Sequence, residues 1–303
     1  MTEKKFLVVI GGPTGVGKTA FAIRIAQHFH TEILSCDSRQ FYQEMHIGTA
    51  KPTLEEQQGV PHHFLSHLSI HDAYSVGNFE TAALELLDKL FKKHKLVVAV
   101  GGSGLYIKAI CEGLDVFPDI PEDIRRAVRD LYHSQGLEAL QDAVATADPD
   151  YFARVDQQNP HRLIRALEVC RATGQPFSSF RKKAVVPRFF TPIYIQLNLP
   201  RAELYTRINQ RVEAMVVAGL LEEAQFLYPH KNRPALQTVG YQELFDYFDG
   251  KMPLPEAIEK IKQNTRNYAK RQLTWWRRDA FWQVFHPSEV TQAIQFIQNQ
   301  ITA

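Results

Sequence analysis

The first residues able to do specific chemistry form a glycine-rich stretch near the amino terminus. "GPTGVGKT" (residues 12–19) fits the phosphate-binding pattern G-x-x-x-x-G-K-[S/T] at every fixed position. In such a loop backbone amides converge on phosphate oxygens, the lysine adds positive charge, and the last hydroxyl is a Mg²⁺ ligand. We therefore predict Mg²⁺ on Thr19 and phosphate groups on Gly12, Pro13, Thr14, Gly15, Val16, Gly17, Lys18 and Thr19.

Two further polar residues follow apolar stretches. Asp37 ends "TEILSCD", and Ser103 lies in "GGSGLY" directly after "LVVAV". Ligands of open α/β sheets bind beyond the carboxyl ends of strands, so we expect these loops to share one cleft with the phosphate loop. We expect Asp37 to end the strand that neighbours the phosphate-loop strand. The pattern alone suits Asp37 either as a general base or as a helix N-cap. The glycines around Ser103 suit either a ligand or a tight packed turn.

Several patterns of other phosphate-binding proteins are missing. The strand "LVVAV" ends in glycines instead of the Mg²⁺-binding Asp of nucleotide hydrolases, and no guanine-reading N-K-x-D occurs. A small-molecule or nucleoside kinase stays open, whereas intact Lys18 and Thr19 disfavour a non-catalytic RNA-binding protein. We interpret four histidines as ordinary loop residues, because their spacing fits no common zinc site: His62, His63, His67 and His71.

Basic residues gather on predicted helices. On "NTRNYAKRQLTWWRR", the helical spacing places Arg266, Lys270 and Arg277 on one face, and Arg271, Trp275 and Arg278 on another. Cations interleaved with aromatics suit RNA phosphate contact and base stacking, but equally a solvated helix whose tryptophan anchors it in the core. Further basic positions are Arg162 and Arg165 on one helix face, "RKK" at 181–183, and Arg207 and Arg211 four residues apart.

The elements that must position these residues follow from the apolar pattern. Uninterrupted apolar runs at 6–10 and 96–100 predict buried parallel strands, with a shorter strand ending near residue 37 and helices at 17–30 and 78–94. After Pro118 the texture is helical up to about residue 186, and strand texture returns with "FTPIYIQLNLP". Helices at about 200–217 and 253–277, the strand "FWQVF" and a last helix follow. This order predicts a parallel α/β sheet flanked by helices, like that of phosphate-loop nucleotide hydrolases, with an inserted all-helical domain: 1–117, 118–187 and 188–303.

The composition indicates the cellular compartment of the protein and the partners it can bind. The 303 residues carry a net charge of only +2, so nucleic-acid contact must depend on local patches. The three cysteines are scattered, which argues against a disulfide framework, and no stretch approaches the roughly 20 apolar residues of a membrane span. We expect a cytoplasmic protein with no membrane contact.

Taken in order, these motifs resemble those of the tRNA dimethylallyltransferases, the isopentenyl-tRNA transferase family. The matching blocks are "GPTGVGKT", "DSRQFY", "GGSGLYIKA", "NPHRLIRALEVCRATGQP", "RINQRVEAMVVAGLLEEA", "TVGYQE" and "TRNYAKRQLTWWRR", and they span nearly the whole chain. Ser103 stands where many relatives have Thr, which keeps the hydroxyl. No zinc-finger extension follows the last block, so the chain resembles the bacterial form.

The resemblance implies transfer of a dimethylallyl group from dimethylallyl diphosphate to N6 of the adenosine on the 3′ side of the anticodon, with release of diphosphate. It also implies that the helical insertion grips the anticodon stem. The catalytic set is then Asp37 as the base, with Thr19, Ser103, Arg207 and Arg211, and we expect a monomer. The chain has no Asp-Asp pair like that of all-helical prenyltransferases, so the phosphate loop must hold the diphosphate. The predicted tRNA contacts are Asp37, Ser38, Arg39, Gln40, Ser103, Arg125, Asn159, Arg162, Arg165, Arg181, Lys182, Lys183, Arg266 and Lys270.

Overall fold

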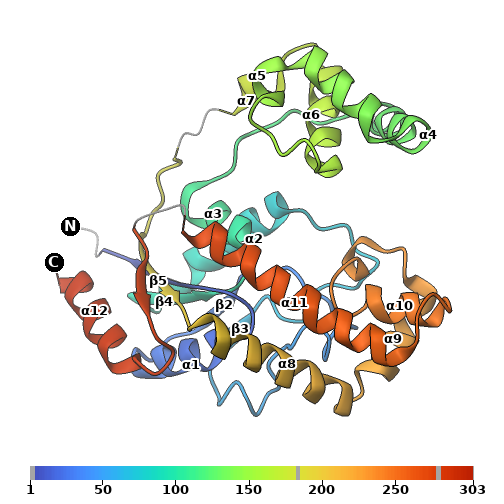
Figure 1. The fold of residues 1–303 in the computed structure, drawn as a ribbon. Helices are drawn as coiled ribbons and strands as arrows, with labels where there is room; N and C mark the ends of the chain where they lie inside the picture. Colours follow the sequence, from blue (N-terminus) through green and yellow to red (C-terminus); the bar gives the residue numbers. More distant parts are fainter. Residues whose placement is uncertain (1–3, 182–184, 278–280, 303) are drawn as a thin grey trace. The chain divides into compact units, whose positions relative to one another are not determined.

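The chain divides into two compact units in a computed structural model that describes residues 4–181, 185–277 and 281–302 (Figure 1). One unit joins Met1–Cys111 to Pro187–Ala303, and the other is Glu112–Val186. The insertion thus begins earlier than residue 118, where the sequence texture changes. Three basic residues singled out by the sequence, Lys182, Lys183 and Arg278, lie outside the described residues.

The first unit is built on a parallel sheet, as predicted. Every strand pairing in the described residues is parallel, and the strand order is β3-β2-β4-β1-β5-β6. The central strands are continuous apolar runs that are buried on both faces, the usual pattern of a sheet covered by helices. The strands are β1 (Phe6–Gly11), β2 (Ile33–Ser35), β3 (His62–His63), β4 (Leu96–Val100), β5 (Thr191–Leu197) and β6 (Gln283–Phe285).

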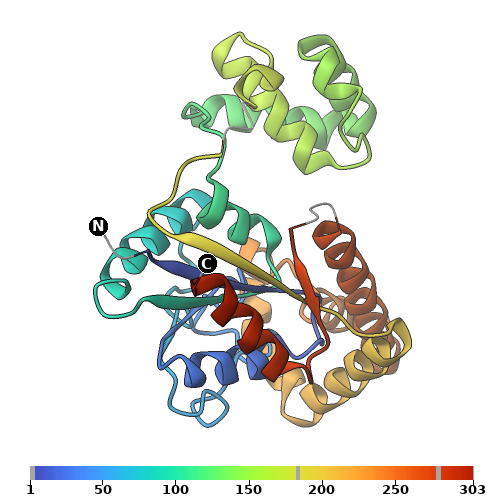
Figure 2. The ribbon, with the colours of Figure 1, turned by 90° about the vertical axis from the view of Figure 1, so that its left-hand side faces the viewer.

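Helices cover both faces of this sheet, and each face has its own apolar core. Alternate residues of β1 separate the two cores: Val8 and Ile10 face one, whereas Leu7 and Val9 face the other. The first core is closed by α1 (Lys18–His28) and α12 (Val290–Thr302), which lie next to each other (Figures 1 and 2). The second is closed by α2 (Val76–Leu90) and α3 (Gly104–Glu112).

Four helices of the carboxyl-terminal half complete the first unit. The long helices α8 (Arg201–Val217) and α11 (Leu254–Trp276) pack side by side, with the short α9 (Leu220–Leu227) and α10 (Gln242–Phe248) at one end (Figure 1). Leu204, Ile208 and Val212 form the buried stripe of α8, at the spacing of one helix face. None of the helices in the described part of the chain is long and apolar enough to cross a membrane.

The strand order fixes where a ligand can bind. From β1 the chain crosses to β2 on one side, whereas from β4 it continues to β5 on the other side of β1. Ligands of open α/β sheets bind at such a switch point, beyond the carboxyl ends of the two strands. The phosphate loop follows β1 and the "GGSG" turn follows β4, so both motifs emerge at this point.

Two expectations about the sheet are wrong. β4 lies between β1 and β2, so Asp37 follows the second strand from β1 and not its neighbour. His62 and His63 form the edge strand β3 instead of a loop. The His63 side chain lies 2.6 Å from Glu32, and such an edge strand of two residues is too short to show any periodicity.

The second unit is helical in its described residues and has its own apolar core. The helices are α4 (Glu122–Ala147), α5 (Pro149–Phe152), α6 (Pro160–Thr173) and α7 (Phe177–Phe180), and α4 is broken at Gly136. The Phe117 ring stacks on Phe177 at 4.9 Å between centroids, which explains why the unit starts before residue 118. The buried Asp148 carboxylate accepts from the Tyr151 and Ser178 amides and so ties α5 to α7.

Candidate active site

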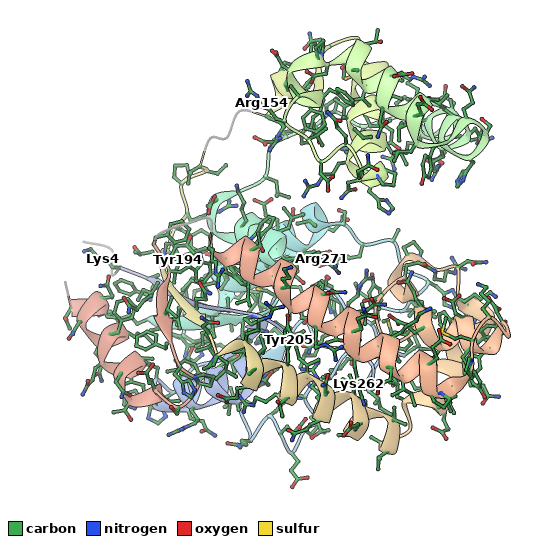
Figure 3. The ribbon with its side chains drawn as sticks, in the orientation of Figure 1. Lys4, Arg154, Tyr194, Tyr205, Lys262 and Arg271 are labelled. Atoms are coloured by element: carbon green, nitrogen blue, oxygen red, sulfur yellow. The ribbon has the colours of Figure 1, made fainter. Side chains whose placement is uncertain are left out.

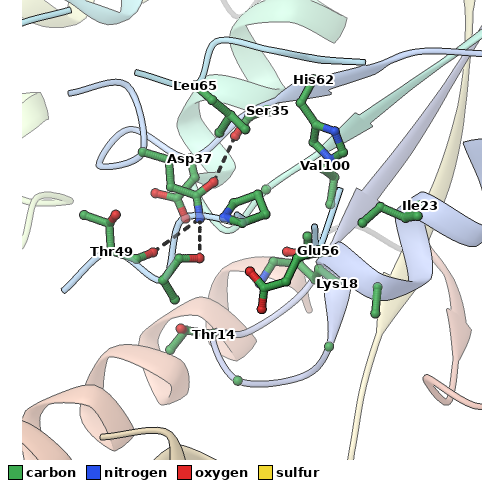
Figure 4. Close-up of a pocket in the computed structure, with 18 of the residues that line it drawn as sticks. Thr14, Lys18, Ile23, Ser35, Asp37, Thr49, Glu56, His62, Leu65 and Val100 are labelled. Atoms are coloured by element: carbon green, nitrogen blue, oxygen red, sulfur yellow. Dashed lines mark hydrogen bonds between the residues drawn. The ribbon is translucent and has the colours of Figure 1, made fainter. Parts of the chain in front are cut away.

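Two adjoining cavities open at the switch point of the first unit. Their volumes are about 400 and 360 Å³, and both are lined by Thr14, Lys18, Asp37 and Arg211. Thr14 and Lys18 come from the phosphate loop and Asp37 from the turn after β2 (Figure 4), whereas Arg211 comes from α8. Thr19 lines the first cavity only. The sheet therefore brings together two cations, a carboxylate and the predicted metal-binding hydroxyl.

The charge of Lys18 is held at an energetic cost. Its Nζ donates to the Pro13 carbonyl at 2.8 Å. Burial lowers the pKa of Lys18 to about 8, the Asp37 carboxylate opposes that shift, and the Arg211 guanidinium adds to it. Burial also lowers the pKa of Arg211, and Asp37 again opposes the shift. An anionic ligand would relieve both cations, so the cleft is electrostatically suited to phosphate.

Asp37 lies in a turn and does not cap a helix. Its Oδ1 accepts from the Arg39 amide two residues later at 3.1 Å, and its carbonyl accepts from the Gln40 amide. This is the local pattern of an Asx turn. The helix N-cap interpretation is therefore wrong, because residues 37–41 form a turn and no helix starts there.

The "GGSG" turn serves two purposes. The Ser103 hydroxyl accepts from the Ser38 amide at 3.2 Å and lies 3.3 Å from the Ser38 hydroxyl, so it joins the turn that carries Asp37. The glycines serve packing against α11. A Cβ at Gly102 would lie 2.4 Å from Gln272 Nε2, and one at Gly104 only 2.1 Å from Trp275 Nε1. The packed-turn interpretation thus explains these glycines but not the serine.

Gln272 of α11 is a site residue that the sequence analysis missed. Its Oε1 accepts from the Thr14 amide at 2.8 Å, and its Nε2 donates to the Gly102 carbonyl at 2.9 Å. A single buried amide therefore ties the phosphate loop to the "GGSG" turn. Its position on the same helix face as Tyr268 and Trp275, four residues after the first and three before the second, was the available signal.

The aromatic residues of α11 differ from the stacking surface that the sequence suggested. Trp276 is only 2% exposed, and Trp275 packs against Gly104, so the tryptophans anchor the helix. The aromatic ring at the second cavity is Tyr268, 38% exposed, with the Arg271 guanidinium 5.8 Å from its centroid. Figure 3 labels Arg271 on this helix. A cation and an aromatic ring are thus paired on α11, but the ring belongs to Tyr268 and not to a tryptophan.

Several predicted RNA-contacting side chains of the first unit already have partners within the chain. The Arg39 guanidinium donates to the carbonyls of Pro234, Ala235 and Gln237. Arg266 donates to Asn209 at 2.6 Å. These bonds hold segments of the protein together, whereas Lys270 is exposed on α11.

The two arginines of α8 lie in different places. Arg207 donates to the Val16 carbonyl at 3.4 Å and lines neither cavity. Arg211, one helical turn later, lines both cavities. Arg207 therefore contacts the backbone of the phosphate loop, and Arg211 faces the space where a ligand would bind.

The cations of the second unit lie at its surface. Arg162 is exposed at the start of α6, where Asn159 caps the helix by accepting from the Arg162 amide. The guanidinium of Arg165 lies 5.5 Å from the centroid of the Phe117 ring, and that of Arg181 lies 5.8 Å from the centroid of Tyr151. Arg125 differs, because its Nε is buried without a partner among the described atoms. Arg154, labelled in Figure 3, is a further exposed arginine of this unit.

Comparison with known proteins gives a consistent result. The family model described as IPP transferase matches residues 40–279. The protein named tRNA dimethylallyltransferase from Christiangramia forsetii is 54% identical over 274 residues, which cover 90% of this chain and 91% of that protein. The one from Cytophaga hutchinsonii is 46% identical over 98% of both chains.

Solved structures of similar proteins share the architecture. The full-length tRNA isopentenylpyrophosphate transferase from Bacillus halodurans aligns with a TM-score of 0.74 and 36% identity, over 99% of this chain and 97% of that one. A eukaryotic dimethylallyltransferase, described as acting on tRNA, aligns with a TM-score of 0.73 and 27% identity over 90% of this chain and 70% of that one. The family model covers well over half of the sequence, and relatives above 30% identity align over nearly all of it. The chain therefore belongs to the IPP transferase family.

Proposed function

We propose that this protein transfers the dimethylallyl group of dimethylallyl diphosphate to N6 of the adenosine that follows the anticodon in tRNA. The observation that carries the proposal is the cleft at the switch point, where Lys18, Arg211 and Asp37 together line both cavities. The relatives of this protein are named as transferases that act on tRNA, and a kinase function is therefore set aside. We expect the enzyme to act as a monomer in the cytoplasm.

The phosphate loop would hold the diphosphate. The loop amides and Lys18 would bind its oxygens, and Arg211 would contact it from α8 in preference to Arg207, which lines neither cavity. The residues fit a Mg²⁺ ion that Thr19 would hold together with the diphosphate, since Thr19 lines the first cavity and the turn directly after β4 (residues 101–104) carries no carboxylate. Such an ion would neutralise charge on the phosphates.

Asp37 would serve as the base. As N6 of the adenine bonds to the allylic carbon, the C–O bond to the diphosphate breaks and its electron pair leaves with the diphosphate. The N6 proton then passes to the Asp37 carboxylate. Lys18 and Arg211 bind the leaving group more tightly as its charge grows, which is where their catalytic effect lies. Ser103 holds the Asp37 turn through Ser38.

RNA would be bound by both units. In the second unit the exposed Arg162 and Arg181 suit phosphate contact, as does Lys270 on α11 in the first. Tyr268 and Arg271 at the second cavity suit a base that has left its stack.

The test is a reaction that contains only purified enzyme, Mg²⁺, dimethylallyl diphosphate and tRNA. We expect a prenylated adenosine by mass analysis of the tRNA, in a reaction that needs no nucleotide and that pyrophosphate inhibits competitively against the donor. Product that appears only with ATP, and ATP consumed in step with it, would contradict the proposal.

A further inference from the structure

Glu223, in the first turn of α9, lies outside both cavities and yet collects four hydrogen bonds. Its Oε2 accepts from the amides of His46 at 2.9 Å and Ile47 at 2.8 Å. Its Oε1 accepts from the Gly48 amide at 2.9 Å and the Tyr241 hydroxyl at 2.7 Å. A carboxylate has about four acceptor sites, so this one is saturated. The 46–48 segment therefore has one well-defined position against α9.

Tyr241 closes the other side of this arrangement. The ring is fully buried, and a Cβ at Gly48 would lie 2.5 Å from its Cζ, so backbone and phenol are in direct contact. Burial and the adjacent Glu223 carboxylate raise the pKa of Tyr241, which keeps the hydroxyl a donor. We call Glu223, Tyr241 and Gly48 the bracket.

The bracket is connected to the Asp37 turn through Gln40. The Gln40 amide group donates to the carbonyls of Thr49 at 3.3 Å and Ala50 at 3.2 Å, as the dashed lines in Figure 4 show. The Gln40 backbone amide donates to the Asp37 carbonyl at 3.1 Å. A continuous set of hydrogen bonds thus runs from α9 through the 46–50 segment to the turn that carries Asp37.

A second connection reaches the same turn through Arg39. Arg39 donates to carbonyls between Pro234 and Gln237, in the segment that leads to Tyr241. Thr238 and Gly240 of that segment line the second cavity, as do Gly48 and Thr49. The bracket therefore joins two walls of the second cavity, which Asp37 also lines.

We infer that Glu223 is a positioning residue for the prenyl transfer: it holds the 46–50 segment and, through Gln40, sets the place of Asp37 in the cleft. The inference rests on the proposed function, with Asp37 as the base. Proton transfer requires hydrogen-bond reach between base and substrate, and a displacement of about 1 Å can reduce a rate by about 10²-fold. A residue that touches no substrate can in this way control the chemical step.

The experiment compares Glu223→Gln with Glu222→Gln, its exposed neighbour on the same helical turn. An amide at position 223 would place an NH₂ group against backbone donors and break at least one hydrogen bond. We expect kcat at saturating tRNA and donor to fall about 10–10²-fold, with both KM values within about twofold of wild type. Tyr241→Phe, which removes one bond and keeps the ring, should have a smaller effect, and Glu222→Gln none.

Two further measurements separate positioning from folding. Thermal unfolding identifies a temperature at which each variant is fully folded, and a merely structural role would leave kcat per folded molecule unchanged there. A double-mutant cycle with Gln40→Ala should be sub-additive, because both changes interrupt the same connection. Additive effects, or a Glu223→Gln enzyme as active as Glu222→Gln, would overturn the inference. A wild-type enzyme that forms no prenylated tRNA would instead overturn the proposed function, and the inference with it.

Discussion

The cations of the cleft and those of the helical insertion have similar chemistry but opposite surroundings. Lys18 and Arg211 line a cavity where burial lowers the pKa of both groups. Arg162 and Arg181 are exposed, and the Arg181 guanidinium lies over the ring of the buried Tyr151. A buried charge acts strongly on what is next to it and is little screened by salt, whereas an exposed charge is hydrated and screened beyond about 8–10 Å.

The difference separates two tasks. A compact anion whose charge grows in the transition state is best met by fixed, partly desolvated donors. A long polyanion is best met by many hydrated cations that release counterions on contact. Changes in the cleft should therefore alter the rate of transfer, and changes on the insertion should alter tRNA affinity and its dependence on salt.

The largest effect is expected from Asp37→Asn. Loss of a positioned base should lower kcat by about 10²–10⁴-fold, with tRNA affinity nearly unchanged, because the amide keeps the size and the turn. Single-turnover rates and tRNA binding measured on the same preparation would test this. Near-normal turnover would show that Asp37 is not the base and only shapes the turn in which it lies.

Lys18→Ala should have the next largest effect. We expect kcat/KM for the donor to fall about 10²–10³-fold, comparable to the loss of one strong oxyanion donor. Lys251→Ala, at an exposed lysine of the same unit, is the matched control. If Lys18→Ala weakened only tRNA binding, the cations of the cleft and those of the insertion would not have different tasks.

The pH dependence should also separate the two sets. Lys18 has its pKa lowered to about 8, so it carries its charge below that pH and loses it above. We expect kcat/KM for the donor to be level below about pH 8 and to fall about tenfold per unit above it. Folding responds in the opposite sense, because the unfolded chain binds the extra proton between about pH 8 and 10.5 and stability from this group rises over that range. A donor profile that stays level to pH 10 would contradict the assignment.

The smallest effect on turnover should come from the insertion. Combined Ala replacement of Arg162, Arg165 and Arg181 should weaken tRNA binding and reduce the slope of log K against log salt by about 0.9 for each true contact with duplex-like phosphate. Arg129, exposed and paired with Glu122 in the same unit, provides the control. Saturating tRNA should restore kcat, and an unchanged slope would show that these cations are merely solvated.

Most of the fold could be predicted because its elements have strong local signals. The buried runs at β1, β4 and β5, the glycine turns and the long helices α8 and α11 all appear where the apolar pattern places them. The edge strand β3 could not be predicted, because two residues carry no pattern. The position of β4 between β1 and β2 is likewise a matter of long-range pairing, which no local spacing encodes.

For the site, the sequence identified charged and glycine-rich residues but not the amides and carboxylates that hold them. Gln272 and Glu223 act by hydrogen bonds to backbone atoms far away in sequence. Such bonds leave no periodicity, since any segment can supply the backbone partner. The resemblance implies that Arg39 contacts tRNA, and within the chain its guanidinium donates to backbone carbonyls. Charge alone does not say which acceptor it will meet.

Part of the hydrogen-bonding capacity of the phosphate loop is used within the protein. Lys18 Nζ rests on the Pro13 carbonyl, and the Thr14 amide is occupied by Gln272. Under the proposed function, the donor would exchange these internal partners for its own phosphate oxygens, and the same groups could pair within the protein again once the diphosphate leaves. A ligand that replaces existing hydrogen-bond partners gains less net affinity than one that binds unpaired donors, because here the donors of the loop already have partners. Product release limits the turnover of many enzymes. A loop whose donors can pair within the protein would therefore favour rapid release of the diphosphate over its tight retention.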